Sequence, residues 1–198
     1  YMNIKRENEI IQRILNGNRE EFSFFVDKYQ GPIYNLVYRL TGSRLDAEDL
    51  AQETFIKAYK SLSNFQIKRK FFSWLYTIAI NLTRNHLKKK KPLLVENVED
   101  LKPDNRHTDK NNPEINLIKH EQAQALESSI QRLPIALREA VILRYYFYLP
   151  FEEISRILCI SLSGAKMRVY RALEKLENLM KGKAEPRFAK ASQGKGQK

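Results

Sequence analysis

Side chains suited to nucleic-acid bases recur along one face of the segment 71–91. Five of them fall at helical spacing and would form a single polar stripe: Thr77, Asn81, Arg84, Asn85 and Lys88. Asparagine and arginine can hydrogen-bond to base edges, and lysine suits phosphate. The stripe predicts a helix that reads nucleic acid. The competing interpretation is an amphipathic core helix with a solvated basic end.

Aromatic residues cluster at the start of the same segment, at Phe71, Phe72, Trp74 and Tyr76. Some of them must belong to a core, because Phe71 and Leu75 share the apolar face. The others exceed what a short helix needs to bury, and aromatic rings can stack on unpaired or flipped bases. Basic runs bracket the cluster, at 68–70 and 88–91. This combination favours single-stranded DNA as the ligand.

A second nucleic-acid signal lies near the C-terminus. Residues 151–170 predict a short helix, a turn over 159–163 and a longer basic helix that Ser161 or Ser163 would cap. Four side chains of the longer helix lie away from its apolar face: Lys166, Met167, Tyr170 and Arg171. Such a helix can enter a major groove with its N-terminal half. An ordinary helical hairpin remains the alternative, since helix-turn-helix patterns have false positives.

An acidic stripe precedes both signals. Asp46, Asp49 and Glu53 fall at i, i+3 and i+7, with Gln52 beside them and an apolar face opposite. Acids in a first turn stabilise a helix through its dipole, which accounts for Asp46 and Asp49. That effect does not reach Gln52 and Glu53. Helix stabilisation and docking of a basic protein surface therefore both remain open.

The composition favours a binding protein over an enzyme. The net charge of +12 over 198 residues favours a polyanionic partner. The histidines are scattered at His86, His107 and His120, and the single cysteine, Cys159, cannot form a disulfide or a zinc cluster within the chain. We find no catalytic constellation and expect no cofactor, metal or small-molecule substrate. The lack of a long apolar run or signal-peptide core predicts a cytoplasmic protein.

The elements that must position these residues all read as helices. Few glycines and prolines, 7 of each, argue against a turn-rich β architecture. Apolar residues at helical spacing predict helices before Gly17, from Phe22 to Gly42 with an interruption at 31–32, from about Asp46, and from Phe71 to Pro92. Further helices are expected over 115–133, around 137–145, and across the helix-turn-helix. The fold class is therefore all-α.

Charge and composition divide the chain into two small helical domains. Residues 93–118 are net acidic, contain Pro103 and Pro113 and show no periodicity, which predicts a flexible linker. The domains would span residues 1–92 and 119–181. The Lys- and Gly-rich tail over 182–198 is expected to be disordered.

Three motifs together resemble a known family. DAEDLAQETFIKAY, then FSWLYTIAINLTRNHLKKKK, then the helix-turn-helix after LPIALREAVILRY are similar to extracytoplasmic-function sigma factors of bacterial RNA polymerase, nearest to the sigma-W group. The similarity covers about residues 8–92 and 120–180. It implies a region 2 helical bundle and a region 4 helix-turn-helix, with core RNA polymerase, promoter DNA and a membrane-anchored anti-sigma factor as partners.

The resemblance also assigns residues to roles. Docking on the polymerase β′ clamp helices falls to Asp46, Asp49, Gln52 and Glu53. Recognition of the minus-ten element falls to Asn64, Lys68, Lys70, Trp74, Tyr76, Asn81, Arg84, Asn85 and Lys88. Recognition of the minus-thirty-five element falls to Lys166, Met167, Arg168, Tyr170 and Arg171. Region 4 would also bind the β flap.

One departure from the family affects the reading helix. Ser163-Gly164-Ala165 stands where the family usually has Gly-Thr-Val, and Leu173 replaces a later arginine. The principal competing function is a stand-alone helix-turn-helix regulator with an N-terminal helical sensor. A third is a protein that coats nucleic acid without promoter preference. Neither requires an acidic helix followed by an aromatic and basic one.

Overall fold

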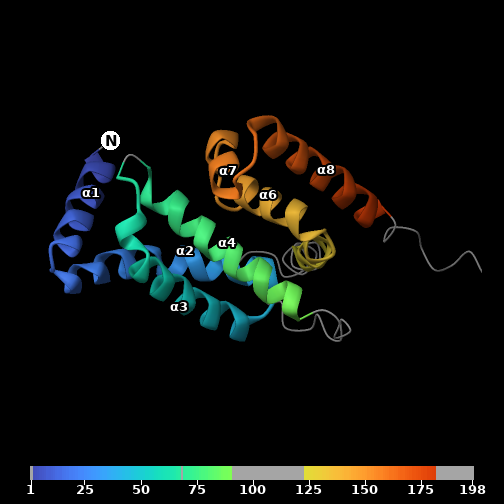
Figure 1. The fold of residues 1–198 in the computed structure, drawn as a ribbon. Helices are drawn as coiled ribbons and strands as arrows, with labels where there is room; N and C mark the ends of the chain where they lie inside the picture. Colours follow the sequence, from blue (N-terminus) through green and yellow to red (C-terminus); the bar gives the residue numbers. More distant parts are fainter. Residues whose placement is uncertain (1, 68, 91–122, 182–198) are drawn as a thin grey trace, which may run out of the picture.

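The computed structural model describes residues 2–67, 69–90 and 123–181, and helices account for nearly all of them (Figure 1). The expected linker and C-terminal tail lie outside these residues. The all-α class is confirmed. The helices in chain order are α1 (Met2–Leu15), η1 (Arg19–Phe22), α2 (Ser23–Thr41), α3 (Arg44–Lys60), η2 (Leu62–Asn64), α4 (Phe71–Lys89), a helical segment over 123–131, α6 (Ile135–Tyr145), α7 (Phe151–Leu158) and α8 (Leu162–Lys181).

The N-terminal half packs around Phe71, whose side chain is 1% exposed. Its ring lies 4.0 Å from that of Phe25 and 5.7 Å from that of Phe65, between centroids. Phe71 opens α4, Phe25 lies in the first turn of α2, and Phe65 follows η2. One aromatic cluster therefore fixes where α4 begins.

The expected interruption of the second helix at residues 31–32 is wrong, because α2 runs through Pro32 without a break. A proline inside a helix removes one backbone hydrogen bond and costs about 3 kcal/mol. Ile33, Leu36 and Val37 continue the buried stripe beyond it, each with no exposed surface. Their burial, roughly 1.5–3 kcal/mol per side chain, outweighs the cost of the proline. The helix ends at Gly42, whose φ of 73° is the left-handed cap conformation that glycine adopts without strain.

The C-terminal half is a compact helix-turn-helix supported by α6. Cys159 ends α7 in the left-handed conformation, with φ of 53°. The backbone N–H of Gly164 donates to Ser161 Oγ at 3.1 Å, so Ser161 is the residue that caps α8. The buried face of α8, which packs against α6 and α7, includes Ala165, Val169 and Ala172.

The two halves lie against each other, with α7 beside α4 and α6 beside the end of α2 (Figure 1). Side chains of the C-terminal half complete the end of α2. Gln131 Nε2 donates to the carbonyl of Arg39 at 2.7 Å, and Arg138 Nη1 donates to the carbonyl of Leu40 at 2.6 Å. These carbonyls belong to the last turn, where helical partners are missing. The closed arrangement therefore satisfies backbone groups as well as side chains.

Replacing Phe71 with alanine should lower the free energy of unfolding by about 3–5 kcal/mol, because the change empties the centre of the aromatic cluster. Urea titration followed by circular dichroism measures this decrease. Leu45→Ala is the matched control, since Leu45 is 73% exposed on a helix. It should change stability by no more than about 0.5 kcal/mol. Equal decreases in the two variants would contradict the packing described here.

Candidate functional site: nucleic-acid and protein-docking surfaces

The polar residues of the stripe on α3 lie in two different environments. Asp46 points toward the end of α4, where its carboxylate lies 2.7 Å from Lys90 Nζ and 3.2 Å from His86 Nε2. Burial alone would raise the pKa of Asp46, but Lys90, His86 and the Ser43 hydroxyl outweigh that effect and lower it. Asp49, Gln52 and Glu53 are exposed. Asp46 thus holds α3 against α4, while the other three face solvent.

Two apolar residues share the exposed face of α3 and were missed at the sequence level. Leu45 is 73% exposed and Ile56 is 54% exposed. With Asp49 and Gln52 they fall at i, i+4, i+7 and i+11, directly opposite the buried face. The signal was available in the sequence, as two large apolar residues on the polar side of the helical wheel. The exposed surface is therefore acidic with an apolar residue at each end.

The proposed single-strand reader on α4 is only partly open to solvent. Asn81, Asn85 and Lys88 are exposed, as is Asn64 in η2, whereas Lys68 lies outside the described residues. The remaining members of the set contact the aromatic cluster or the C-terminal half: Lys70, Trp74, Tyr76 and Arg84.

Aromatic residues of the reader are packed rather than free. The Trp74 ring lies 5.2 Å from Phe65 and 5.5 Å from Phe71, and its side chain is half-buried. Tyr76 is 5% exposed and meets Phe147 of the C-terminal half edge to face at 5.4 Å. Burial raises the pKa of the Tyr76 hydroxyl. Trp74 is therefore only partly accessible at the surface, and Tyr76 is almost fully covered.

Arg84 forms the most specific contact between the halves. Its Nε and Nη2 each donate to a different carboxylate oxygen of Glu139, both at 2.6 Å, so the pair is bidentate. The Glu139 side chain has no exposed surface. The hydrogen bonds to Glu139 raise the pKa of the Arg84 guanidinium. Arg84 Nη1 also donates to Asn81 Oδ1 at 3.4 Å, which links the exposed and covered parts of the stripe.

The reading helix α8 presents the side chains expected of it. Lys166, Met167, Tyr170 and Arg171 are exposed, and Arg168 is half-buried. The atypical start has a local explanation at Gly164. A Cβ atom there would lie 3.1 Å from Ser161 Oγ, so glycine leaves room for the capping hydroxyl.

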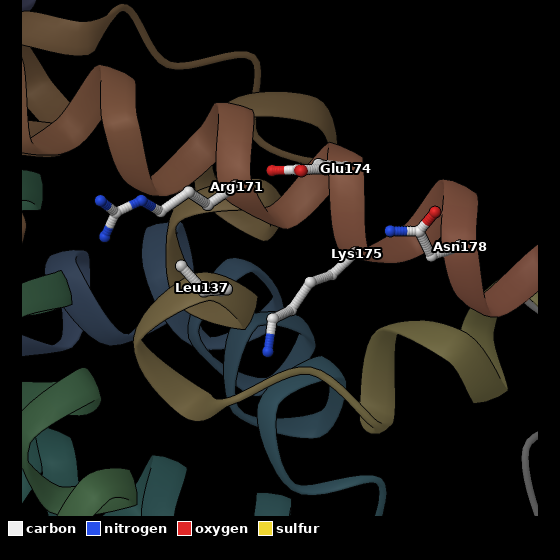
Figure 2. Close-up of a pocket in the computed structure, with 5 residues that line it drawn as sticks. All are labelled: Leu137, Arg171, Glu174, Lys175 and Asn178. Atoms are coloured by element: carbon white, nitrogen blue, oxygen red, sulfur yellow. The ribbon is translucent and has the colours of Figure 1, made fainter.

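A pocket between α8 and α6 is lined by two basic side chains of α8, Arg171 and Lys175. Figure 2 shows Arg171 and Lys175 projecting from α8 on either side of Leu137, which belongs to α6. Glu174 and Asn178 complete the lining. The described part of the chain contains no cluster of three or more potential metal ligands, and none of its helices is long and apolar enough to cross a membrane.

Comparison with known proteins matches both halves. Residues 25–92 match the family description Sigma-70 region 2, and residues 123–176 match Sigma-70, region 4. The chain is 36% identical over 177 residues to the ECF RNA polymerase sigma factor SigW of Bacillus subtilis, covering 86% of this chain and 95% of that protein. It is 32% identical over 182 residues to the RNA polymerase sigma-H factor of Pseudomonas aeruginosa, covering 89% and 94%.

Two solved structures share the fold. CnrH in complex with the cytosolic domain of CnrY matches with a TM-score of 0.63 at 19% identity, over 88% of this chain and 97% of that one. RpoE in complex with the anti-sigma factor NepR from Bartonella quintana matches with a TM-score of 0.65 at 21% identity, over 82% and 98%.

The Asp46 contacts predict a pH-dependent contribution to stability. Because the pKa of Asp46 is lowered in the folded chain, the stabilisation is present above its ordinary value of 3.8 and is lost as pH falls through the lowered value. Asp46→Asn should therefore lower the free energy of unfolding by about 1 kcal/mol at pH 6 and by progressively less below pH 4. Chemical denaturation across this pH range measures the difference. Glu48→Gln, at an exposed site on α3, is the control. An Asp46→Asn effect that is constant with pH would rule out the ion-pair explanation.

Proposed function

Since the chain belongs to the extracytoplasmic-function sigma factors of the sigma-70 family, we propose that its two helical halves divide the work of promoter recognition. The chain is an initiation factor that binds core bacterial RNA polymerase, directs it to promoters and helps to open the DNA. It would act in the cytoplasm, where the polymerase and the promoter are found. We propose residues 1–92 as region 2 and residues 119–181 as region 4, a division that the family matches over 25–92 and 123–176 support.

Docking on core polymerase is assigned to the exposed face of α3. The observation that carries this assignment is the acidic face over Asp49, Gln52 and Glu53 with Leu45 and Ile56 at its ends. Apolar side chains that become buried in an interface contribute affinity, and charged side chains contribute orientation and association rate. The partner surface would be basic with apolar contacts, as the β′ clamp helices are expected to be. A stand-alone regulator or a coating protein has no need of this face.

DNA reading is assigned to α4 and α8. On α4, Asn81, Asn85 and Lys88 are available to the opened minus-ten strand, and Lys70 and Arg84 would join them once the C-terminal half is displaced. On α8, Lys166, Met167, Arg168, Tyr170 and Arg171 would face the minus-thirty-five duplex. An arginine or lysine can read guanine there, and a methionine offers apolar contact to a thymine methyl group.

Regulation by an anti-sigma factor is part of the proposal. One protein of the same fold, RpoE, is seen with the anti-sigma factor NepR, and another, CnrH, is seen with the cytosolic domain of CnrY. A membrane-anchored partner would hold this chain away from polymerase until a signal releases it.

The docking assignment predicts that Asp49→Lys with Glu53→Lys weakens binding to core polymerase by several kcal/mol, because reversed charges repel the basic surface. Fluorescence titration with purified core polymerase measures the change. Glu20→Lys with Asp27→Lys is the charge-matched control, since both residues are exposed elsewhere on the same half. The control should bind as the unaltered chain does. Equal binding by all three proteins, with unchanged circular dichroism, would remove α3 from the interface.

The division of DNA reading predicts opposite responses to a pre-melted template. Lys166→Ala with Arg171→Ala should lower promoter recruitment, by roughly 1–3 kcal/mol for each base-reading side chain removed, and a pre-melted minus-ten bubble should not repair this fully. Asn81→Ala should spare recruitment but slow opening, because base capture offsets the cost of unpairing. The bubble should then restore part of its activity. Permanganate footprinting of thymines follows opening in both variants. Normal opening by Asn81→Ala, with bubble rescue of the α8 variant, would reverse the assignment of the two halves.

A further inference from the structure

The surface of α4 that is to hold DNA is partly occupied by the chain's own C-terminal half. Arg84 is bound by Glu139 of α6, and Lys70 and Ser73 are bound by Glu153 of α7. Thr77 Oγ1 lies 3.0 Å from the carbonyl of Ile157. Of the proposed reading stripe, Thr77 and Arg84 are therefore engaged.

The groups that occupy α4 resemble nucleic acid in their chemistry. Glu139 fills the bidentate fork of the Arg84 guanidinium, which is how a phosphate or the edge of a guanine would bind it. Glu153 accepts from the Lys70 ammonium and, at 2.8 Å, from the Ser73 hydroxyl. Burial alone would raise the pKa of Glu153, but Lys70, Ser73 and Arg156 together lower it, so the carboxylate is charged at neutral pH. Two carboxylates thus stand where DNA would present its acceptors.

The contact is of a kind that can separate. Ion pairs and hydrogen bonds join α4 to the C-terminal half, with the Tyr76–Phe147 ring pair beside them, and the buried apolar residues of the two halves form one cluster. Interfaces between domains of one chain resemble transient protein interfaces, and relative motion is expected unless the interface is large and hydrophobic. When the halves part, Glu139 and Glu153 return to water, and Arg84 and Lys70 become available. Opening therefore replaces the ion pairs of Arg84 and Lys70 with contacts to water or to DNA.

We propose that the C-terminal half is an internal mask for the minus-ten reader, with Glu139 and Glu153 acting as DNA mimics that hold α4 closed in the free chain. This proposal rests on the function proposed above for α4. DNA and the mask compete for Arg84 and Lys70, so either one weakens the other by the same factor. The mask keeps a strongly basic chain from binding single-stranded DNA before polymerase has separated the two halves.

The test compares neighbouring acids on α7. Glu153→Gln removes a charge that faces α4, whereas Glu152→Gln removes the same charge from an exposed site one residue away. Glu139→Gln is a second, independent disruption. Two quantities are measured for each variant without polymerase. One is affinity for a fluorescein-labelled 20-nucleotide single-stranded DNA of mixed sequence. The other is the maleimide labelling rate of a thiol introduced by Thr77→Cys in a Cys159→Ser background.

Glu153→Gln and Glu139→Gln should bind the oligonucleotide about tenfold more tightly than Glu152→Gln, within the range typical of coupling between sites. Both should also label faster at position 77, since Thr77 lies against α7. Equal labelling in all three variants would overturn the proposal, because the halves would then not be held by these carboxylates. Faster labelling without tighter DNA binding would also overturn it, because opening would not uncover a DNA site.

Core polymerase binding by the same variants separates this inference from the proposed function. If the unaltered chain binds core polymerase and initiates transcription while the mask variants gain nothing, the mask is refuted and the function stands. If no protein binds polymerase, the function fails, and the labelling rates still report whether the halves are held closed. Circular dichroism confirms that each variant is folded. Should Glu139→Gln unfold, the comparison of Glu153→Gln with Glu152→Gln decides the matter.

Discussion

Glu139 carries a carboxylate with no exposed surface, and the guanidinium of Arg84 is the partner that makes its burial tolerable. A buried charge that loses its partner destabilises a protein by roughly 3–5 kcal/mol, so Glu139 requires either this ion pair or access to water. Arg84 lies on α4 and Glu139 on α6, in different halves of the chain. The pair therefore couples the position of the C-terminal half to the accessibility of Arg84 on α4, the helix proposed to read the minus-ten element. The Arg84–Glu139 ion pair thus links the packing of the two halves to the accessibility of α4.

Other polar groups also find their partners across the contact between the two halves. Gln131 and Arg138 satisfy carbonyls at the end of α2, beside Gly42, where helical partners run out. Arg39 lies 3.7 Å above the Tyr146 ring and is also bound by Glu127. Each of these groups could be satisfied by water after separation.

Helices and their apolar faces could be predicted from sequence because both depend on neighbours within a few turns. Ser161 was one of two candidate caps, and only the hydrogen bond from Gly164 distinguished them. Local propensity predicts an interruption at Pro32, whereas the burial on either side of it, which outweighs the cost of the proline, depends on tertiary packing. The exposure of Leu45 and Ile56 likewise depends on which face of α3 the fold leaves open. The partners of Glu139 and Glu153 lay beyond prediction, since they are 55 and 83 residues away and depend on how the halves pack.

If the free chain is closed through Arg84 and Glu139 and core polymerase opens it, the distance between the two halves must increase in the complex. The most direct test is the distance between spin labels attached through Gln12→Cys on α1 and Asn178→Cys on α8, both at exposed sites, in a Cys159→Ser background. Pulsed electron paramagnetic resonance measures this distance with and without core polymerase. The account predicts one narrow distribution for the free chain and a shift to longer distances in the complex. A broad distribution in the free chain, or an identical one in the complex, would contradict it.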